Sequence, residues 1–287
     1  MAVTPPVVLT IAGFDPSSGA GITADIKTIA AHECYGVSCI TALTVQSTRG
    51  VCRVEPVDPG IIAETLEELA SDVTVEAVHI GMLGSGRAVG VVADFLTKAR
   101  LRHVVLDPIL KSSSGVDLLD AAGIREMIER LMPLAEVITP NLDEAGVLTG
   151  MAAVTNLDQM REAATRLHVL GAANVVVTGG HLEKAIDLLS LTTGQGTETE
   201  VFKADRVRSN STHGTGCAFA TSLACHLAQG RGLPEAVLLS KVYVSAAIAS
   251  AHPLGHGKGP LHHLYRMSQQ RRASSVVSDK EPAHSRN

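Results

Sequence analysis

Short, largely apolar runs alternate along this chain with segments of helical periodicity. Val7–Ala12 is such a run; it ends in the glycine-rich turn Gly13–Gly21, and isoleucines then recur at helical spacing. The same order of strand-like run, polar or glycine-rich turn and helix-like segment returns around His103–Leu106 and Asn174–Thr178. Runs without polar alternation are typical of strands buried on both faces of a parallel sheet. The pattern therefore predicts an α/β fold, with a central, mostly parallel sheet, helices on both faces and right-handed crossovers.

The body of the chain carries no linker or internal repeat that would divide it. We therefore expect one domain over residues 1–266, in which 45% hydrophobic residues supply the core. Ile186–Leu191 and Thr199–Phe202 predict a late antiparallel hairpin at the sheet edge. Residues 267–287 are rich in Ser, Arg and Gln, and this composition predicts a disordered tail.

Charge and composition exclude several classes of function. A net charge of −5, with three Tyr, four Phe and no Trp, argues against a nucleic-acid partner. The five cysteines show no C-x-x-C spacing, which favours a reducing cytoplasm over a disulfide framework or a zinc cluster. No basic leader and no run of 18 apolar residues is present, so neither export nor membrane insertion is expected.

Polar residues gather where the predicted strands end, which is where open α/β sheets bind ligands. The first turn carries Gly19 and Gly21 without a third glycine three residues later, so it does not match the dinucleotide fingerprint G-x-G-x-x-G. A Rossmann dehydrogenase is therefore not expected. Asp25 lies one turn into the following helix; taken alone, it is interpreted as a solvated charge rather than as a ligand.

The stretch Ser211–Cys217 places Gly214 and Gly216 directly before a helix-forming segment rich in Ala and Leu. The unpaired N–H groups and the positive dipole of a helix N-terminus make such a turn a cradle for phosphate. Cys217, in the first helical turn, is expected to have a lowered pKa. The alternative is a glycine-rich cap on a buried helix, with Cys217 as a small core residue.

Three histidines near the C-terminus, His256, His262 and His263, lack an acidic or cysteine companion. We expect them to be structural or exposed rather than metal ligands.

Taken together, the strand-end motifs resemble a known family. Eight motifs follow one another in the order TIAGFDPSSGAGITADIKT, GVSCITALTVQSTRGV, IGMLGS, VVLDPIL, ITPNLDEAGVLTG, VTGGHLE, THGTGC and GHGKGPLHH. Over roughly residues 7–264 the chain resembles the ribokinase-like superfamily, and within it the hydroxymethylpyrimidine/phosphomethylpyrimidine kinases of thiamine biosynthesis.

The resemblance implies a role for each matching position. The residues implied to surround the pyrimidine are Gly13, Asp25, Gln46, Met82 and Ile109. Those implied on the ATP side are Asp107, Asn141, Glu144, Thr178 and His213, with Asp107 and Glu144 holding Mg²⁺ through water. The anion hole is expected from Gly214, Thr215, Gly216 and Cys217, where Cys217 acts as a base or positions the attacking hydroxyl.

The implied reaction is phosphorylation of 4-amino-5-hydroxymethyl-2-methylpyrimidine by ATP, first to the monophosphate and then to the pyrophosphate. Thr178 stands where many such kinases carry lysine, which predicts weaker ATP binding or a weaker second step, and Ser18 stands where glycine is usual. A pyridoxal kinase, a thiol hydrolase using Cys217 with His213, and a catalytically silent binding protein remain as alternatives. Homodimers are common in the superfamily.

Overall fold

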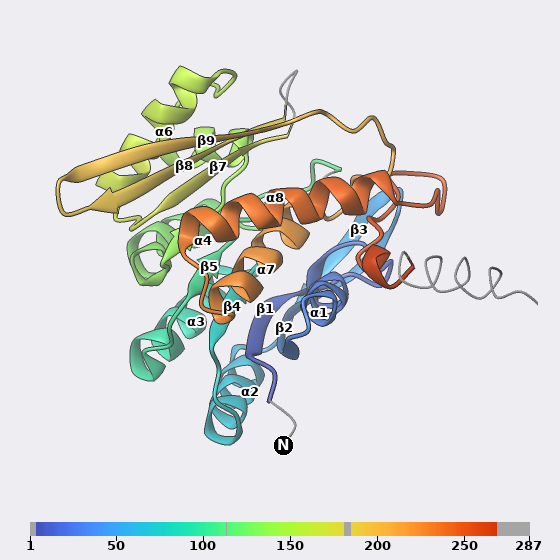
Figure 1. Cartoon of the computed structure of the whole chain (residues 1–287). Coiled ribbons are helices and arrows are strands. Elements are labelled where there is room, and N and C mark those ends of the chain that lie inside the picture. The colour runs from blue at the N-terminus through green and yellow to red at the C-terminus, as the bar shows by residue number, and fades with distance from the viewer. Residues whose placement is uncertain (1–3, 113, 181–184, 269–287) are drawn as a thin grey trace, which may run out of the picture.

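The computed structural model describes residues 4–112, 114–180 and 185–268, and one nine-stranded sheet runs through them (Figure 1). The strand order is β3-β2-β1-β4-β5-β6-β7-β8-β9, parallel from β2 to β7 and antiparallel at both edges. The predicted mostly parallel sheet and its late edge hairpin are therefore confirmed. Of the predicted disordered tail, residues 269–287 lie outside the described residues.

The strands are short in the middle of the sheet and long at its edges. They are β1 (Val7–Phe14), β2 (Tyr35–Ser47), β3 (Gly50–Pro56), β4 (Ala77–Ile80), β5 (Val104–Leu106), β6 (Val137–Ile138), β7 (Val175–Gly179), β8 (Ala185–Thr193) and β9 (Gly196–Ala204).

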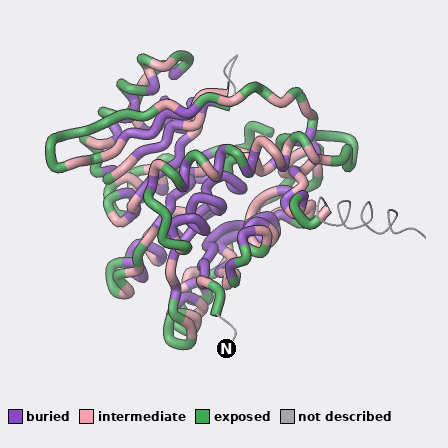
Figure 2. Tube along the Cα trace, viewed as in Figure 1, coloured by how far each residue is buried: buried purple, intermediate pink, exposed green. Residues whose placement is uncertain are grey.

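Helices cover both faces of the sheet. The first face carries α1 (Gly21–Ala31), α7 (Thr215–Ala228) and α8 (Leu233–Ala249). The second carries α2 (Pro59–Asp72), α3 (Gly86–Ala99), α4 (Ala121–Glu126), α5 (Leu142–Thr149) and α6 (Leu157–Val169). α4 runs on through a π-helical turn, Met127–Leu131, and a 3-10 turn, Met132–Leu134. Since successive strand residues point to opposite faces, each layer of helices packs on its own apolar cluster. Figure 2 shows the buried sheet between these two layers.

The β2–β3 hairpin departs from the sequence interpretation. β2 runs from Tyr35 to Ser47 and pairs antiparallel with β3, a hairpin that the sequence interpretation did not include. At its far end Leu43 and Val45 are 50% and 59% exposed. The sequence VCRVEP alternates polar and apolar residues, as expected of an edge strand with one solvated face.

Three buried histidines make the stability of the fold sensitive to acid. Burial disfavours the charged imidazolium and lowers the pKa of His32, His226 and His263 to about 4. Among the C-terminal histidines, His263 is a core residue and His256 is exposed. Both agree with the prediction that these histidines are structural or exposed.

We expect the melting temperature of wild type to fall more between pH 7.5 and pH 5 than that of His226→Leu, by about 4 °C. Between about pH 6.5 and pH 4 the unfolded chain binds protons that the folded chain excludes, so acid favours unfolding. Thermal melts across this range test the expectation. His226→Leu should flatten the pH profile, while His256→Gln serves as the exposed control, and equal profiles for all three proteins would contradict the prediction.

Candidate active site

Two backbone loops from opposite ends of the chain meet where the central strands end. Gly214 caps α7 with φ +81°, and a β-carbon at this position would lie 1.9 Å from the carbonyl oxygen of Gly19. Only glycine permits this approach, because both the positive φ and the missing side chain are required. The glycine-rich turn after β1 is thereby fixed against the N-terminus of α7, where unpaired N–H groups favour an anion.

One residue of the first loop, Ser18, stands where the resemblance implies glycine. Ser18 adopts φ +59°, a left-handed conformation that glycine takes at lower cost. Lys27 of α1 donates from Nζ to the carbonyl oxygen of Ser18 at 2.8 Å and stabilises the turn.

Three of the residues implied for the pyrimidine gather at the ends of β1, β4 and β5. A β-carbon on Gly13 would lie 3.0 Å from Met82 Sδ, so the absence of a side chain there makes room for Met82. Ile109 reaches the same region, since its Cδ1 would be 3.7 Å from a β-carbon on Gly81. The thioether and the isoleucine form an apolar wall of the kind that packs against a planar ring.

Asp25 takes a different role from both sequence interpretations. It is completely buried, and its carboxylate accepts hydrogen bonds from Thr10 Oγ1 at 2.7 Å and from Thr221 Oγ1 at 2.9 Å. His79 Nδ1 lies 3.3 Å from the same carboxylate. Asp25 is thus neither a solvated charge nor a surface on which a substrate could rest, and we correct it to an internal carboxylate joining β1, α1, β4 and α7.

Sequence reasoning missed His79, the partner of Asp25. Burial alone would lower the pKa of His79, but the adjacent Asp25 carboxylate outweighs it, so the pKa is raised. A buried contact between a histidine and a carboxyl group therefore lies beneath the site. A histidine within an otherwise apolar strand sequence is the signal that could have found it.

Asp107 and Glu144 bring two buried carboxyl groups together. Burial raises the pKa of Asp107 to about 6, although the nearby His79 works against this. Burial and the neighbouring Asp107 together raise the pKa of Glu144 to about 8. A buried carboxyl whose pKa is raised by a second carboxyl, as that of Glu144 is by Asp107, marks a site suited to a cation.

Asn141 and Glu144 also cap α5. The amide oxygen of Asn141 accepts from the backbone N–H of Glu144 at 2.9 Å, and Glu144 Oε2 accepts from the backbone N–H of Asn141 at 2.9 Å. This capping box occupies one oxygen of each side chain and holds both at the end of β6. Thr178 lies alongside, forming a parallel bridge with Asn141.

The magnesium that the fold family implies fits this donor set. Within residues 4–112, 114–180 and 185–268, no three His, Cys, Asp or Glu side chains gather as a metal cage. Mg²⁺ keeps several waters and commonly binds through one or two carboxylates together with substrate phosphates. Asp107 and Glu144 supply hard oxygen donors of this kind, and Asp107 lies close to Gly216 at the start of α7.

Cys217 corrects the expectation of a lowered pKa. Burial raises the pKa of the thiol well above its usual range, and the carboxylates of Asp107 and Asp25 raise it further. The backbone of Gly21 acts in the opposite direction but is outweighed. The helix end was expected to favour the thiolate, yet desolvation and like charge prevail, so Cys217 is a neutral thiol.

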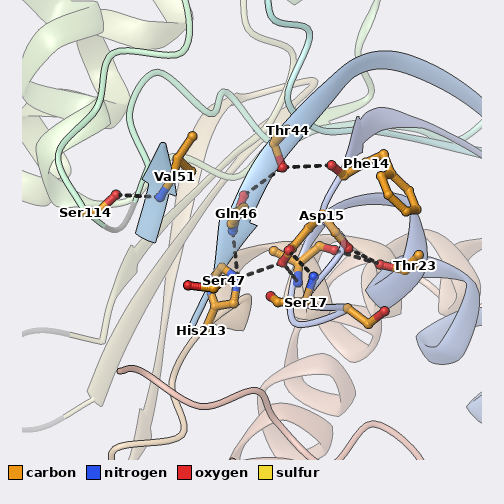
Figure 3. Close-up of polar contacts among 12 residues, drawn as sticks. Phe14, Asp15, Ser17, Thr23, Thr44, Gln46, Ser47, Val51, Ser114 and His213 are labelled. Atoms are coloured by element: carbon orange, nitrogen blue, oxygen red, sulfur yellow. Dashed lines mark hydrogen bonds and ion pairs between the residues drawn. The ribbon is translucent and has the colours of Figure 1, made fainter. Parts of the chain in front are cut away.

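Gln46 and His213 contact each other beside Asp15 of the first loop (Figure 3). His213 Nε2 lies 2.8 Å from Asp15 Oδ2 and 3.1 Å from the amide nitrogen of Gln46. His213 is implied for the ATP phosphates by the resemblance; its side chain contacts Asp15 and also Gln46, which is implied for the pyrimidine. Asp15, which links the two loops, was missed, although an acidic residue directly after a buried strand is itself a signal.

A second missed pair stands at the end of β7. Lys241 of α8 donates to Asp187 Oδ2 at 2.6 Å, and Asp187 Oδ1 accepts from the backbone N–H of Gly179. Both side chains are buried. A buried cation is thus joined through Asp187 to the backbone of Gly179, the residue after Thr178, and a single lysine in the apolar sequence of α8 could have indicated it.

Comparisons with known proteins agree with this architecture. Residues 15–262 match the phosphomethylpyrimidine kinase family. The chain is 45% identical over 259 residues to the thiamine biosynthesis bifunctional protein ThiED of Geobacter sulfurreducens; the match covers 90% of this chain but only 52% of that protein. It is 41% identical to the hydroxymethylpyrimidine/phosphomethylpyrimidine kinase of Rhizobium meliloti, covering 91% of this chain and 97% of that one.

Among solved structures, a Bacillus subtilis pyridoxal kinase in complex with ADP superimposes with a TM-score of 0.83 at 34% identity. The match covers 92% of this chain and all of that one.

Proposed function

The chain belongs to the phosphomethylpyrimidine kinase family and has the ribokinase-like fold, and from this premise we propose how its own residues carry out the reaction. It is a kinase of thiamine biosynthesis that phosphorylates 4-amino-5-hydroxymethyl-2-methylpyrimidine and then its monophosphate. ATP is the proposed phosphoryl donor, in keeping with the ADP bound by the Bacillus subtilis relative.

Each part of the site has a defined task in this proposal. Gln46 binds the polar edge of the pyrimidine, and Met82 with Ile109 packs against its ring. Gly214, Thr215 and Gly216 present backbone N–H groups to the transferring phosphoryl group, whose spreading negative charge they stabilise.

The metal side of the proposal rests on Asp107, Asn141 and Glu144. Asp107 and Glu144 hold Mg²⁺ through water, and Asn141 and Thr178 line the ATP phosphates beside them. When bound, the ion supplies positive charge that neutralises the phosphates. The observation that carries the proposal is the meeting of the α7 N-terminus with Asp107 at the carboxyl ends of the strands, because phosphoryl transfer mainly needs positioning and charge neutralisation.

Mass spectrometry of the products tests this function. The purified protein is incubated with Mg²⁺ and ATP and either the hydroxymethylpyrimidine or pyridoxal. Successive monophosphate and pyrophosphate products from the pyrimidine support the proposal. Phosphorylation of pyridoxal alone would instead favour the activity named for the Bacillus subtilis structure.

For Cys217 we expect a modest kinetic role. A neutral thiol cannot accept the substrate proton, and phosphoryl transfer of this type needs little help from a base. Cys217→Ala should therefore lower kcat by less than about 10-fold, and Cys217→Ser should stay close to wild type, as measured by steady-state kinetics. A loss of 10²-fold or more in Cys217→Ala, together with a lost inflection in the pH–rate profile, would restore Cys217 as the base.

Three broader proposals accompany the reaction. We propose that residues 1–266 form a single kinase domain. The five cysteines, all without disulfides, support a reducing cytoplasm. None of the helices in the described part of the chain is long and apolar enough to cross a bilayer.

We also propose a homodimer in which the exposed Leu43 and Val45 of β2 are covered. Sedimentation of wild-type protein as a monomer at micromolar concentration would refute it.

A further inference from the structure

The amide of Gln46 lies in a polar network that joins two loops to the end of β2 (Figure 3). Asp15 follows β1, Gln46 is near the end of β2, and His213 precedes α7. His213 Nε2 contacts both Asp15 Oδ2 and the Gln46 amide, and Thr44 Oγ1 lies 3.2 Å from the other end of that amide. Each residue of the network lies within hydrogen-bond distance of the next, so the donor or acceptor role of one group decides the role of its neighbour.

Asp15 fixes the role of His213. The Asp15 carboxylate already accepts from the backbone N–H groups of Ser17 at 2.8 Å and Ala20 at 3.0 Å. Burial alone would raise the pKa of Asp15, but hydrogen bonds from His213 and Ser17 outweigh it and lower the pKa. An ionised carboxylate only accepts hydrogen bonds, so the histidine nitrogen 2.8 Å away must donate. His213 therefore carries its proton on Nε2.

His213 in turn fixes the amide of Gln46. The single Nε2–H is donated to Asp15 and can be shared with the Gln46 amide, 3.1 Å away, only if that amide presents its oxygen; the amide nitrogen in that place would set N–H against N–H. Half a turn of the amide exchanges its two ends and brings the carbonyl oxygen toward His213.

Thr44 accepts the same orientation. Its hydroxyl donates to the carbonyl oxygen of Phe14 at 2.9 Å and has only one hydrogen to give. Its oxygen can therefore accept from an NH₂ group of Gln46, but it cannot also donate to a carbonyl there. Both neighbours thus require the carbonyl on the His213 side and the NH₂ on the Thr44 side.

We propose that Asp15 and His213 are positioning residues that lock the Gln46 amide in one orientation and so make the site select 4-aminopyrimidines over 4-oxopyrimidines. The inference rests on the proposed function, in which Gln46 binds the pyrimidine.

In this orientation the Gln46 carbonyl retains one lone pair for a ligand, and the Gln46 NH₂ retains one N–H. A 4-aminopyrimidine pairs with both, because its amino group donates and its ring nitrogen accepts. A 4-oxopyrimidine presents the reverse pattern and leaves two polar groups opposed.

Competition between two substrates tests this selection. We expect wild-type protein to prefer 4-amino-5-hydroxymethyl-2-methylpyrimidine over its 4-oxo analogue by at least about 10²-fold in kcat/KM. His213→Phe keeps a ring against Gly19 but removes the N–H, so Thr44 alone still favours one orientation and the reversed amide becomes accessible. In this variant the preference should fall below about 10-fold, and KM for the amino substrate should rise more than kcat falls. His256→Phe, at an exposed histidine, is the matched control and should keep the wild-type preference.

A second measurement does not depend on turnover. Long-range ¹H–¹⁵N correlation spectra report which ring nitrogen carries the proton, and His213 can be assigned by its absence from the His213→Phe spectrum. We expect the Nε2–H form in wild-type protein, and loss of that fixed tautomer in Asp15→Ala.

Three outcomes would overturn the inference. An Nδ1–H tautomer at His213 would remove its basis, even if the variants fail to fold. An unchanged preference in an active His213→Phe would leave only a structural role for the histidine. A wild-type protein that phosphorylates pyridoxal but neither pyrimidine would overturn the proposed function as well, which separates the two failures.

Discussion

Alanine in place of Gly214 is expected to lower kcat/KM by roughly 10²-fold or more, because it forces apart the two loops that build the site. The new β-carbon would lie 1.9 Å from a backbone oxygen of Gly19, and no side-chain rotation can relieve a clash with main chain. The loops must separate by about 1 Å or more, which moves the N–H groups of α7 away from the transferring phosphoryl group. Steady-state kinetics measure the loss in kcat/KM, and urea denaturation of the same protein measures the change in the free energy of unfolding.

Gly230 provides a matched control for this substitution. Its φ of +80° is nearly that of Gly214, but a β-carbon there would meet nothing within 4 Å among the described residues. Gly230→Ala should therefore cost only the strain of the left-handed backbone, about 1 to 2 kcal/mol, and leave kcat/KM unchanged. If Gly214→Ala behaved in the same way, the contact between the loops would have no part in catalysis.

Removing the charge of Glu144 should reduce kcat by roughly 10²- to 10³-fold while the fold stays as stable as wild type. Glutamine preserves the capping box, since its amide oxygen can still accept from the backbone N–H of Asn141. Glu144→Gln thus separates the two roles of this residue. Glu144→Ala should lose both, with a further cost of about 1 kcal/mol in the free energy of unfolding.

Asp143→Asn is the control for Glu144→Gln, because it neutralises an exposed carboxylate in the same first turn of α5. It should keep wild-type kcat. Kinetics at several Mg²⁺ concentrations and urea melts of the three variants provide the comparison. An active Glu144→Gln beside an inactive Glu144→Ala would mean that Glu144 serves the helix cap alone.

The sequence was sufficient for features that depend on local pattern. The apolar run Val7–Ala12 predicts a strand and lies in β1. The Ala- and Leu-rich segment after Gly216 predicts a helix and lies in α7. The glycines of the two loops were found because a tight turn before a helix has a recognisable composition. The rule that ligands bind at the carboxyl ends of parallel strands predicts the site in the loops there, and its residues stay a prediction.

Features that depend on distant partners were not predictable in this way. Asp25 was misjudged because its burial depends on Thr221, 196 positions later, and on His79 in another strand. Cys217 was misjudged because the helix terminus is a local feature, whereas desolvation and the charge of Asp107 arise only in the folded protein. The β2–β3 hairpin was missed because β2 begins with the apolar sequence of a buried strand, whereas its far end is exposed.

The separation of the site's parts along the chain also governs when activity can first arise during synthesis. Asp15 and His213 lie 198 positions apart, and α7 packs in the middle of the sheet against β1, β4 and β5 (Figure 1). A ribosome therefore completes the first glycine loop long before it delivers the helix that faces it, and contacts of such long range form slowly. A nascent or prematurely terminated chain lacking α7 is thus an inactive protein with an exposed sheet face, a substrate for chaperones and proteases rather than a partial enzyme.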